Sequence, residues 1–445
     1  MSAFYGQSGT VYRTSGTPAG RGGRGRFFRC VDNPAVGVKV LDDPAERAEC
    51  RDRADLLSRW SGVTRTMLPI EAVSEVPGGP LVGYALPVAE GDPLGVVLNP
   101  PARAKAGRRM GERDLIGVGA SAAEGMAEGH AAGLPEGDVN LGNRIVSRVR
   151  TNGRYEARRI DADSSPVRGT TRGGRLADFK CPVGQPEFTP PEASGKNLRT
   201  VDRGWQSDVF GLAVLIWMLV KEGSHPFAWR HRHGGSVPSI AETIQDGGWP
   251  FSPQKPLPPG VEPVDVGVRF RDLPPQVQAL FTRAFRDGHA DPSKRPTARE
   301  WADALTTWER QTSRAAADAR AYLSTLWRLV AGRAGLGAVS RVVAIFRRPA
   351  KSPLSPAPAR PAKGRLRVRV PAALLMVAAA ALVTICGVKY LPPFLADRGA
   401  EMPRHSAEPD GPAGSRQLQP DDLFDGVPLW DELHREVNAE RRKAP

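Results

Sequence analysis

Cysteine is scarce in this sequence. Its 445 residues include only Cys30, Cys50, Cys181 and Cys386, and none of them stands in a C-x-x-C spacing. This pattern supports neither a zinc site nor a disulfide framework, and it suits a reducing compartment. A secretory leader is also missing, because Met1 is not followed by a basic region and then an apolar one. We therefore expect the N-terminal part of the chain to stay in the cytoplasm.

Acidic side chains are almost absent from residues 311–369. This stretch holds 13 Lys and Arg against the single Asp318, so it carries most of the net charge of +14. Arginines alternate with apolar residues over 320–346, which predicts one or two basic amphipathic helices. A basic juxtamembrane segment that binds anionic lipids explains this position better than a DNA-reading surface does. We expect no nucleic acid as a partner.

Charge is entirely missing from residues 370–388. These 19 residues are long enough to cross a bilayer. A buried helix of a soluble domain is the alternative, but no other foldable sequence surrounds the run. The basic residues before it outnumber those after it, so the positive-inside rule predicts one span at 370–390 with its N-terminal side in the cytoplasm. The polar tail, 391–445, would then lie outside the cytoplasm of a cell (inner or plasma) membrane.

Short β-type runs dominate the first 90 residues, and helical patterns dominate the rest. The predicted strands are 11–14, 25–31, 36–41, 70–73 and 81–86, with one helix at 44–60. The later predicted helices are 113–132, 207–221, 273–287 and 297–312, around a loop-rich region at 140–197. This order predicts an α+β fold, with a small β lobe (10–90), a larger helical lobe (91–310) and a cleft between them.

A glycine-rich motif lies in the small lobe. It has the form G-x-G-x-x-G followed by an apolar residue, and its members are Gly20, Gly22, Gly23, Gly25 and Phe27. Glycines let backbone N–H groups approach phosphate oxygens, although a flexible Arg/Gly loop has the same composition. Lys39 then interrupts an apolar strand pattern. A buried lysine needs an anionic partner such as phosphate, unless it lies on an edge strand and reaches water.

Two polar clusters follow in the large lobe. Asp138 and Asn143 match a loop of the form D-x-x-x-x-N, in which the Asp deprotonates a hydroxyl and the Asn oxygen binds Mg²⁺. An ordinary Asx-rich turn is the alternative. Asp161 and Asp163 come after a strand, and a carboxylate there suits Mg²⁺, which prefers oxygen ligands beside phosphates.

Three further features complete an ordered set. They are Glu192 at the end of P-P-E, Asp208 in an apolar helix and Arg295 within K-R-P. Taken together, the motifs resemble those of the eukaryotic-like bacterial serine/threonine protein kinases over roughly residues 10–310. The sequences G-D-x-N and D-x-D-S resemble a divergent branch of that family. The resemblance implies a two-lobed protein-kinase fold that uses ATP and Mg²⁺.

The resemblance also implies roles for the residues that contact the nucleotide. Lys39 would hold the α- and β-phosphates, and Asp138 would be the catalytic base. Asn143 and Asp161 would hold Mg²⁺. The glycine motif with Phe27 would cover the phosphates, and the hinge that begins at Leu86 would receive the adenine.

Three other residues would support the large lobe, again by resemblance. Glu192 would pair with Arg295, and Asp208 would tie its helix to the catalytic loop. Similar bacterial kinases often work opposite a protein phosphatase, which makes such a phosphatase an expected partner.

The match departs from the family at several positions. Glu136 and Gly137 replace the His and Arg before the catalytic Asp, and Asn140 replaces the usual Lys. The family's D-F-G reads D-A-D here, so Asp163 is the alternative metal ligand to Asp161.

The acidic partner of Lys39 on the small-lobe helix is also open. Glu46, Glu49 and Asp52 are the candidates, and we take Glu49 as the prediction. The groups that touch nucleotide, metal and acceptor hydroxyl are retained, so we expect an active enzyme that phosphorylates protein Ser/Thr. The alternative is a pseudokinase that acts as a nucleotide-binding membrane scaffold.

Overall fold

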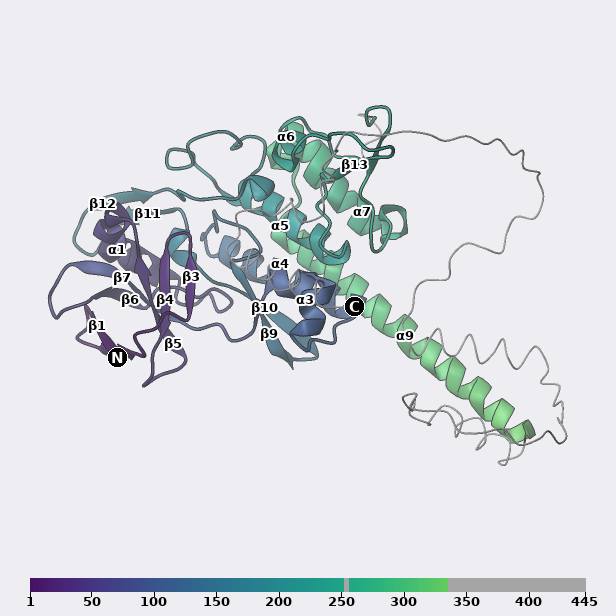
Figure 1. Cartoon of the computed structure of the whole chain (residues 1–445), viewed down its shortest axis with the longest axis horizontal. Coiled ribbons are helices and arrows are strands. Elements are labelled where there is room, and N and C mark those ends of the chain that lie inside the picture. Colours follow the sequence, from purple (N-terminus) through teal and green to yellow (C-terminus); the bar gives the residue numbers. More distant parts are fainter. Residues whose placement is uncertain (252–255, 335–445) are drawn as a thin grey trace, which may run out of the picture. The chain divides into compact units, whose positions relative to one another are not determined.

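One antiparallel sheet of seven strands forms the small lobe. The computed structural model describes residues 1–251 and 256–334, and Figure 1 shows this sheet, whose strand order is β2-β1-β6-β7-β5-β4-β3. The strands are β1 (Ser2–Gly6), β2 (Val11–Thr14), β3 (Gly20–Gly22), β4 (Gly25–Arg29), β5 (Val36–Leu41), β6 (Glu71–Ser74) and β7 (Leu81–Pro87). The sequence predicts five of them, and β1 and β3 are additional.

A single helix, α1 (Pro44–Leu57), packs against this sheet. It begins where Asp43 accepts a hydrogen bond from the Ala45 amide at 2.8 Å, and Pro44 fits the first turn because its missing N–H needs no partner there. Its buried residues Cys50 and Ala54 share a core cluster with Tyr84 of β7. A 3₁₀ turn, Ser58–Trp60, extends it to the predicted end.

Eight helices of the described chain follow the sheet. They are α2 (Leu94–Leu98), α3 (Pro100–Lys105), α4 (Glu112–Ala131), α5 (Trp205–Val220), α6 (Ile240–Gln245), α7 (Pro275–Thr282), α8 (Gly288–Ala290) and α9 (Ala298–Ala334). A π-helical segment, Arg283–Asp287, continues α7. Helix α5 packs against α4 and is buried on all sides from Ser207 to Val220, which explains its unbroken apolar sequence.

Three small sheets complete the large lobe. The strands are β8 (Asp92–Pro93), β9 (Arg144–Thr151) and β10 (Arg154–Arg159) in the first, β11 (Val167–Thr170) and β12 (Leu176–Phe179) in the second, and β13 (Trp229–His231) and β14 (Val261–Pro263) in the third. The β9–β10 hairpin agrees with the β-type run at 144–147 and the hairpin-like segment at 151–158 of the sequence. The β11–β12 hairpin does not, because its polar and glycine-rich sequence resembles a loop.

The observed helix α9 differs from the prediction at one helix boundary. The sequence predicts a helix that ends at residue 312 and a basic helix that begins at 320, whereas α9 is continuous from Ala298 to Ala334. Residues 313–319 contain neither Gly nor Pro and are rich in Ala, so nothing there interrupts a helix. The chain divides into compact units after Thr312.

The membrane predictions concern residues beyond these helices. Within 1–251 and 256–334, no helix combines the length and the apolar character that a bilayer crossing requires. The predicted span at 370–390, the linker at 347–369 and the tail at 391–445 all lie outside the described residues. The predicted α+β class is confirmed, and the antiparallel sheet followed by helices fits a kinase-like fold.

A buried histidine, His225, joins the loop after α5 to the segment that leads to Glu192. Its Nδ1 accepts a hydrogen bond from the Phe227 amide at 3.2 Å, and its Nε2 donates to the carbonyl of Glu187 at 2.9 Å. Both ring nitrogens are therefore used by the neutral form. Burial lowers the pKa of His225 to about 3, although the Glu187 carbonyl acts in the opposite direction.

This burial predicts acid sensitivity. Below the unfolded pKa of 6.5 the unfolded chain binds a proton that folded His225 does not bind until about pH 3, so stability falls between these values. Replacing His225 with Gln should reduce the slope of unfolding free energy against pH by about 1.4 kcal/mol per unit in that window. Denaturant titrations at pH 7, 6, 5 and 4 measure it. Parallel slopes for both proteins would contradict the assignment.

Candidate active site

Lys39 lies in the middle of the small-lobe sheet. Strand β5 pairs with β4 on one side and β7 on the other, where Lys39 stands opposite Phe27 and Tyr84, so it is not on an edge strand. The residue is 6% exposed. Its Nζ donates to both carboxylate oxygens of Asp163 at 3.0 and 3.1 Å and forms an ion pair with Asp161 at 3.2 Å. Burial alone would lower the pKa of Lys39, but these two carboxylates raise it.

The two aspartates of the D-A-D motif have different surroundings. Asp161 has a φ of 57°, a left-handed conformation uncommon for a residue with a side chain, and it precedes the 3₁₀ turn Ala162–Ser164. Its side chain is 41% exposed, whereas that of Asp163 is fully buried. The carboxylate of Asp161 therefore faces solvent and can bind a ligand. The carboxylate of Asp163 is instead paired with buried cations.

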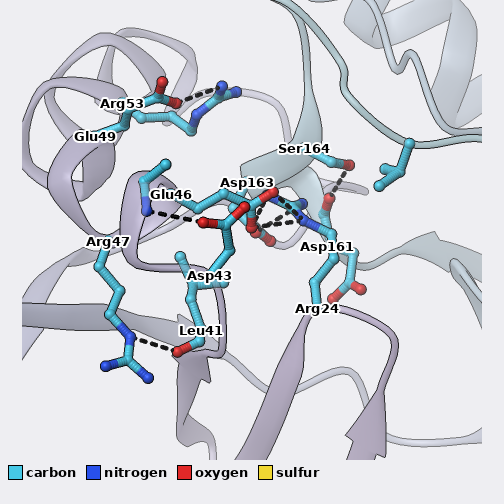
Figure 2. Close-up of polar contacts among 12 residues, drawn as sticks. Arg24, Leu41, Asp43, Glu46, Arg47, Glu49, Arg53, Asp161, Asp163 and Ser164 are labelled. Atoms are coloured by element: carbon cyan, nitrogen blue, oxygen red, sulfur yellow. Dashed lines mark hydrogen bonds and ion pairs between the residues drawn. The ribbon is translucent and has the colours of Figure 1, made fainter. Parts of the chain in front are cut away.

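Arg24 is the second cation at Asp163, and sequence reasoning missed it. It extends from the turn between β3 and β4, and its guanidinium lies 3.2 Å from Asp163 and 3.0 Å from Glu46 of α1 (Figure 2). Burial alone would raise the pKa of Asp163, but Lys39 and Arg24 lower it. The only signal in the sequence is an arginine between glycines, which does not tell where its side chain points.

The predicted pairing of Lys39 with Glu49 needs correction. Glu49 instead bonds Arg53, four residues further along α1, at 3.3 Å, and its side chain is 42% exposed (Figure 2). Local i,i+4 geometry favours that partner. The carboxylates of Asp161 and Asp163 already surround Lys39, and Glu46 is bound by Arg24. The third candidate, Asp52, pairs with Arg175.

The predicted catalytic loop brings Asp138 and Asn143 together. The Asn143 amide donates to the backbone carbonyl of Asp138 at 2.8 Å and to its Oδ2 at 2.9 Å. The other oxygen, Oδ1, is buried and has no hydrogen-bond partner within the part of the chain that the structure describes. Asn140 shapes the loop as an Asx turn, because its side-chain oxygen accepts from the amides of Gly142 and Asn143 at 2.8 and 3.1 Å.

Asp208 supports this loop from α5. It is buried and accepts hydrogen bonds from the amides of Glu136 and Gly137 at 2.7 and 2.8 Å, and His130 lies 2.9 Å away. Burial alone would raise the pKa of Asp208, but His130 and the two amides lower it. The backbone of the two residues before Asp138 is thus held in place by a carboxylate on α5.

The departures at Glu136 and Gly137 have structural reasons. Glu136 forms a buried ion pair with Arg144, with a closest approach of 2.6 Å. Gly137 has a φ of 79°, and a Cβ there would lie 2.7 Å from the Cβ of Cys181. Only glycine fits this backbone and this contact. A side chain in the place of the family's Arg is therefore excluded.

Glu192 and Arg295 form a two-point ion pair. The Arg295 guanidinium donates to both carboxylate oxygens at 2.6 and 2.7 Å and also to the carbonyl of Gln206 at 2.9 Å. Its side chain is fully buried, and Gln206 is the second residue of α5, which Figure 1 shows within the large lobe. The pair thereby joins the P-P-E segment to the start of α5.

The predicted nucleotide-contacting residues lie on neighbouring strands. Gly25 approaches β5 so closely that a Cβ would lie 2.0 Å from the Val40 carbonyl, whereas Cβ atoms at Gly20, Gly22 and Gly23 would meet no atom within 4 Å. The ring of Phe27 contacts the backbone at Gly37, which stands opposite Leu86 in the sheet. Phe27 and Leu86 therefore flank the same glycine.

The β11–β12 hairpin follows the D-A-D motif and docks on α1. Arg172 lies 2.7 Å from Asp55, Arg175 pairs with Asp52, and Arg53 stacks on the ring of Phe179 at 4.5 Å. Apolar residues of α1 and of both strands share one core cluster. The hairpin is therefore held on α1 by ion pairs and apolar contacts between side chains of the protein.

Comparison with known proteins relates the chain to a protein kinase. No model of a known protein family matches the chain. Over 306 residues it is 26% identical to the protein kinase YegI of Escherichia coli (strain K12) and equally to YegI of Escherichia coli O157:H7. This distant homology supports a kinase family. The match covers 67% of this chain and 45% of YegI, so the chain spans about half the length of these relatives.

The docked hairpin predicts that phosphorylation within it is dispensable. Replacing Thr170 and Thr171 with Ala should change the initial rate of phosphate transfer by less than about twofold, because Gly137 offers no cation to a phosphate and arginines already hold the hairpin. Asp52→Asn with Asp55→Asn is the matched control, and it should slow transfer by removing the partners of Arg172 and Arg175. A large loss in the Thr variants would mean that another cation, such as Arg168, binds a phosphate.

Proposed function

We propose that this chain is a membrane-anchored serine/threonine protein kinase that transfers the γ-phosphoryl group of ATP to protein hydroxyls. The observation that carries the proposal is the buried ammonium of Lys39, held between the exposed carboxylate of Asp161 and the buried one of Asp163. This arrangement presents a fixed cation beside a solvent-facing carboxylate. A nucleotide triphosphate with a divalent cation has the complementary charges.

The acceptor hydroxyl would react at Asp138. Its Oδ2 is engaged by Asn143, and its buried Oδ1 lacks a partner among the residues described, so the carboxylate keeps acceptor capacity for the hydroxyl proton once substrate binds. As the new bond forms between the hydroxyl oxygen and the γ-phosphorus, the bond from phosphorus to the bridging oxygen of ADP breaks. Lys39 and the glycine turn would orient the phosphates, because a loose transition state depends on positioning and charge neutralisation.

Mg²⁺ fits the donors that this site offers. Among residues 1–251 and 256–334, no three His, Cys, Asp or Glu side chains form a metal-binding group, but Mg²⁺ needs only one or two protein oxygens beside phosphates and waters. Asp161 offers an exposed carboxylate, and Asn143 offers its side-chain oxygen because its nitrogen is used by Asp138. When bound, Mg²⁺ would neutralise charge on the transferred phosphate.

The acceptor would be a protein rather than a small molecule. The ion pair between Glu192 and Arg295 braces the P-P-E segment, a feature that the resemblance connects with protein substrates. A protein phosphatase is the expected opposing partner.

A pseudokinase scaffold is the second candidate. Asn140 favours it, because it replaces a cation and its side-chain oxygen is turned into the loop toward two backbone amides. Such a protein would bind nucleotide and a partner at the membrane without turnover.

Phosphate transfer tests the proposal directly. With Mg²⁺ and labelled ATP, Asp138→Ala and Asp161→Ala should each lower incorporation into protein by about 100-fold or more. The Asp161 variant should remain folded, because Lys39 keeps its contacts with Asp163. Asp32→Ala, a surface charge removal, is the control and should keep full activity.

Two other outcomes would decide against this assignment. Nucleotide binding without any incorporation by the unchanged protein would favour the scaffold. Near-normal activity of Asp161→Ala would remove its role as a metal ligand and transfer it to Asp163.

We further propose that residues 370–390 anchor the chain in the cell membrane, with the catalytic unit in the cytoplasm. The support is the uncharged run of 19 residues and the basic stretch before it. The basic residues at 311–369 would bind anionic lipids, at about 1 kcal/mol for each Lys or Arg near the surface.

Reporter fusions at Pro445 test this topology. A reporter active only outside the cytoplasm should be active there, and one active only in the cytoplasm should be silent. Deleting residues 370–388 should reverse both results, because the span is then missing. Cytoplasmic activity at Pro445 of the unchanged chain would refute the span.

A further inference from the structure

Arg24 connects three elements of the candidate active site. It lies in the turn between β3 and β4, its Nε donates to both oxygens of Glu46 at 3.1 and 3.2 Å, and its Nη1 donates to Asp163 at 3.2 Å. Glu46 belongs to α1 and Asp163 to the D-A-D motif. One planar guanidinium thus bridges two carboxylates that are 117 residues apart in sequence.

The charges around this bridge depend on one another. The side chains of Arg24 and Glu46 are 14% and 10% exposed, and Asp163 is fully buried. Lys39 does not serve as the partner of Glu46, because its ammonium pairs with Asp161 and Asp163. Removal of Arg24 would leave the Glu46 carboxylate largely buried with no opposite charge at this distance. Losing one partner of such a pair is costly.

The bridge also fixes the position of the glycine turn. The neighbouring glycines Gly22 and Gly23 have open space around them, so little packing restrains the tip of the turn. The contacts of Arg24 are the polar restraints on this tip that reach the D-A-D motif. Only an arginine has the length and the forked donors to satisfy both carboxylates at once.

We infer that Arg24 is a positioning residue for phosphoryl transfer, which holds the glycine turn and α1 against Asp163. The inference rests on the proposed function and deepens it. Through Glu46, the carboxylate of the small-lobe helix is bound to the glycine turn rather than to Lys39. Arg24 thereby sets where the turn lies over the phosphates and keeps Asp163 oriented toward Lys39.

Kinetics of full-length variants test this role. Arg24→Gln should raise the KM for ATP about tenfold or more, because it removes charge-assisted hydrogen bonds that restrain the turn. The KM for the protein acceptor should change by less than twofold. Arg13→Gln removes the same charge from an exposed position on β2, where Arg13 pairs with Asp32, and should leave both constants unchanged. A merely structural role would lower the amount of active enzyme and leave both KM values intact.

A double-mutant cycle tests the partner. Glu46→Gln should reproduce the effect of Arg24→Gln, and the double variant should be no worse than either single one. Arg24→Lys should recover only part of the ATP affinity, because an ammonium cannot bridge both carboxylates. Fully additive losses, or full recovery with Lys, would overturn the inference.

The same variants separate this inference from the proposed function. If the unchanged protein transfers no phosphate, the proposed function fails, and coupling between Arg24 and Glu46 is then measured in binding of Mg²⁺–ADP or in unfolding. If the unchanged protein is active and Arg24→Gln keeps its ATP KM within twofold, the positioning role fails while the kinase assignment stands.

Discussion

The ammonium of Lys39 is the constraint on which this structure depends. It lies between two neighbouring strands in the interior of a sheet, where an unpaired charge would be prohibitively costly. Its compensation comes from Asp161 and Asp163, which follow the β9–β10 hairpin of the other lobe. The small lobe therefore does not itself provide the carboxylates that pair with its central lysine. The need to pair one charge brings together the sheet, α1 and the D-A-D motif.

A second set of buried charges organises the large lobe. Asp208 fixes the backbone before Asp138, and Glu136 pairs with Arg144 in place of the side chains that the family uses. Position 137 requires glycine, because its backbone conformation and its contact with Cys181 leave no room for a side chain. The departures from the family's motif are thus mutually compatible, since each replaced group has a partner in the structure.

The fold was largely predictable from the sequence because apolar periodicity reports burial directly. The boundaries of α4 and α5 lie within two residues of the prediction, and α5 follows from an unbroken apolar run. The motif order also predicted Lys39 and Asp161 in one site, and these two residues form an ion pair. The sequence pattern alone did not show which charged side chains pair with one another.

The errors had a common physical origin. Glu49 was predicted to pair with Lys39 from its position on a helix. In the structure, Arg24 binds Glu46 and Arg53 binds Glu49, so neither carboxylate pairs with Lys39. Arg24 reaches Glu46 and Asp163 across 22 and 139 residues of sequence, whereas the contact of Arg53 with Glu49 is local. The β11–β12 hairpin was missed for a similar reason, because its strands are stabilised by docking on α1 rather than by their own composition.

The pairing of Lys39 with Asp163 also has a consequence for synthesis of the chain. The lysine precedes its buried carboxylate by 124 residues. At about 5–20 residues per second, a ribosome needs roughly 6–25 s to make that interval. During this time the nascent small lobe carries an uncompensated ammonium in its central strand, so the sheet cannot close tightly around β5. The N-terminal lobe must therefore wait for the second lobe before it completes its core, and the two lobes mature together although one is made well before the other.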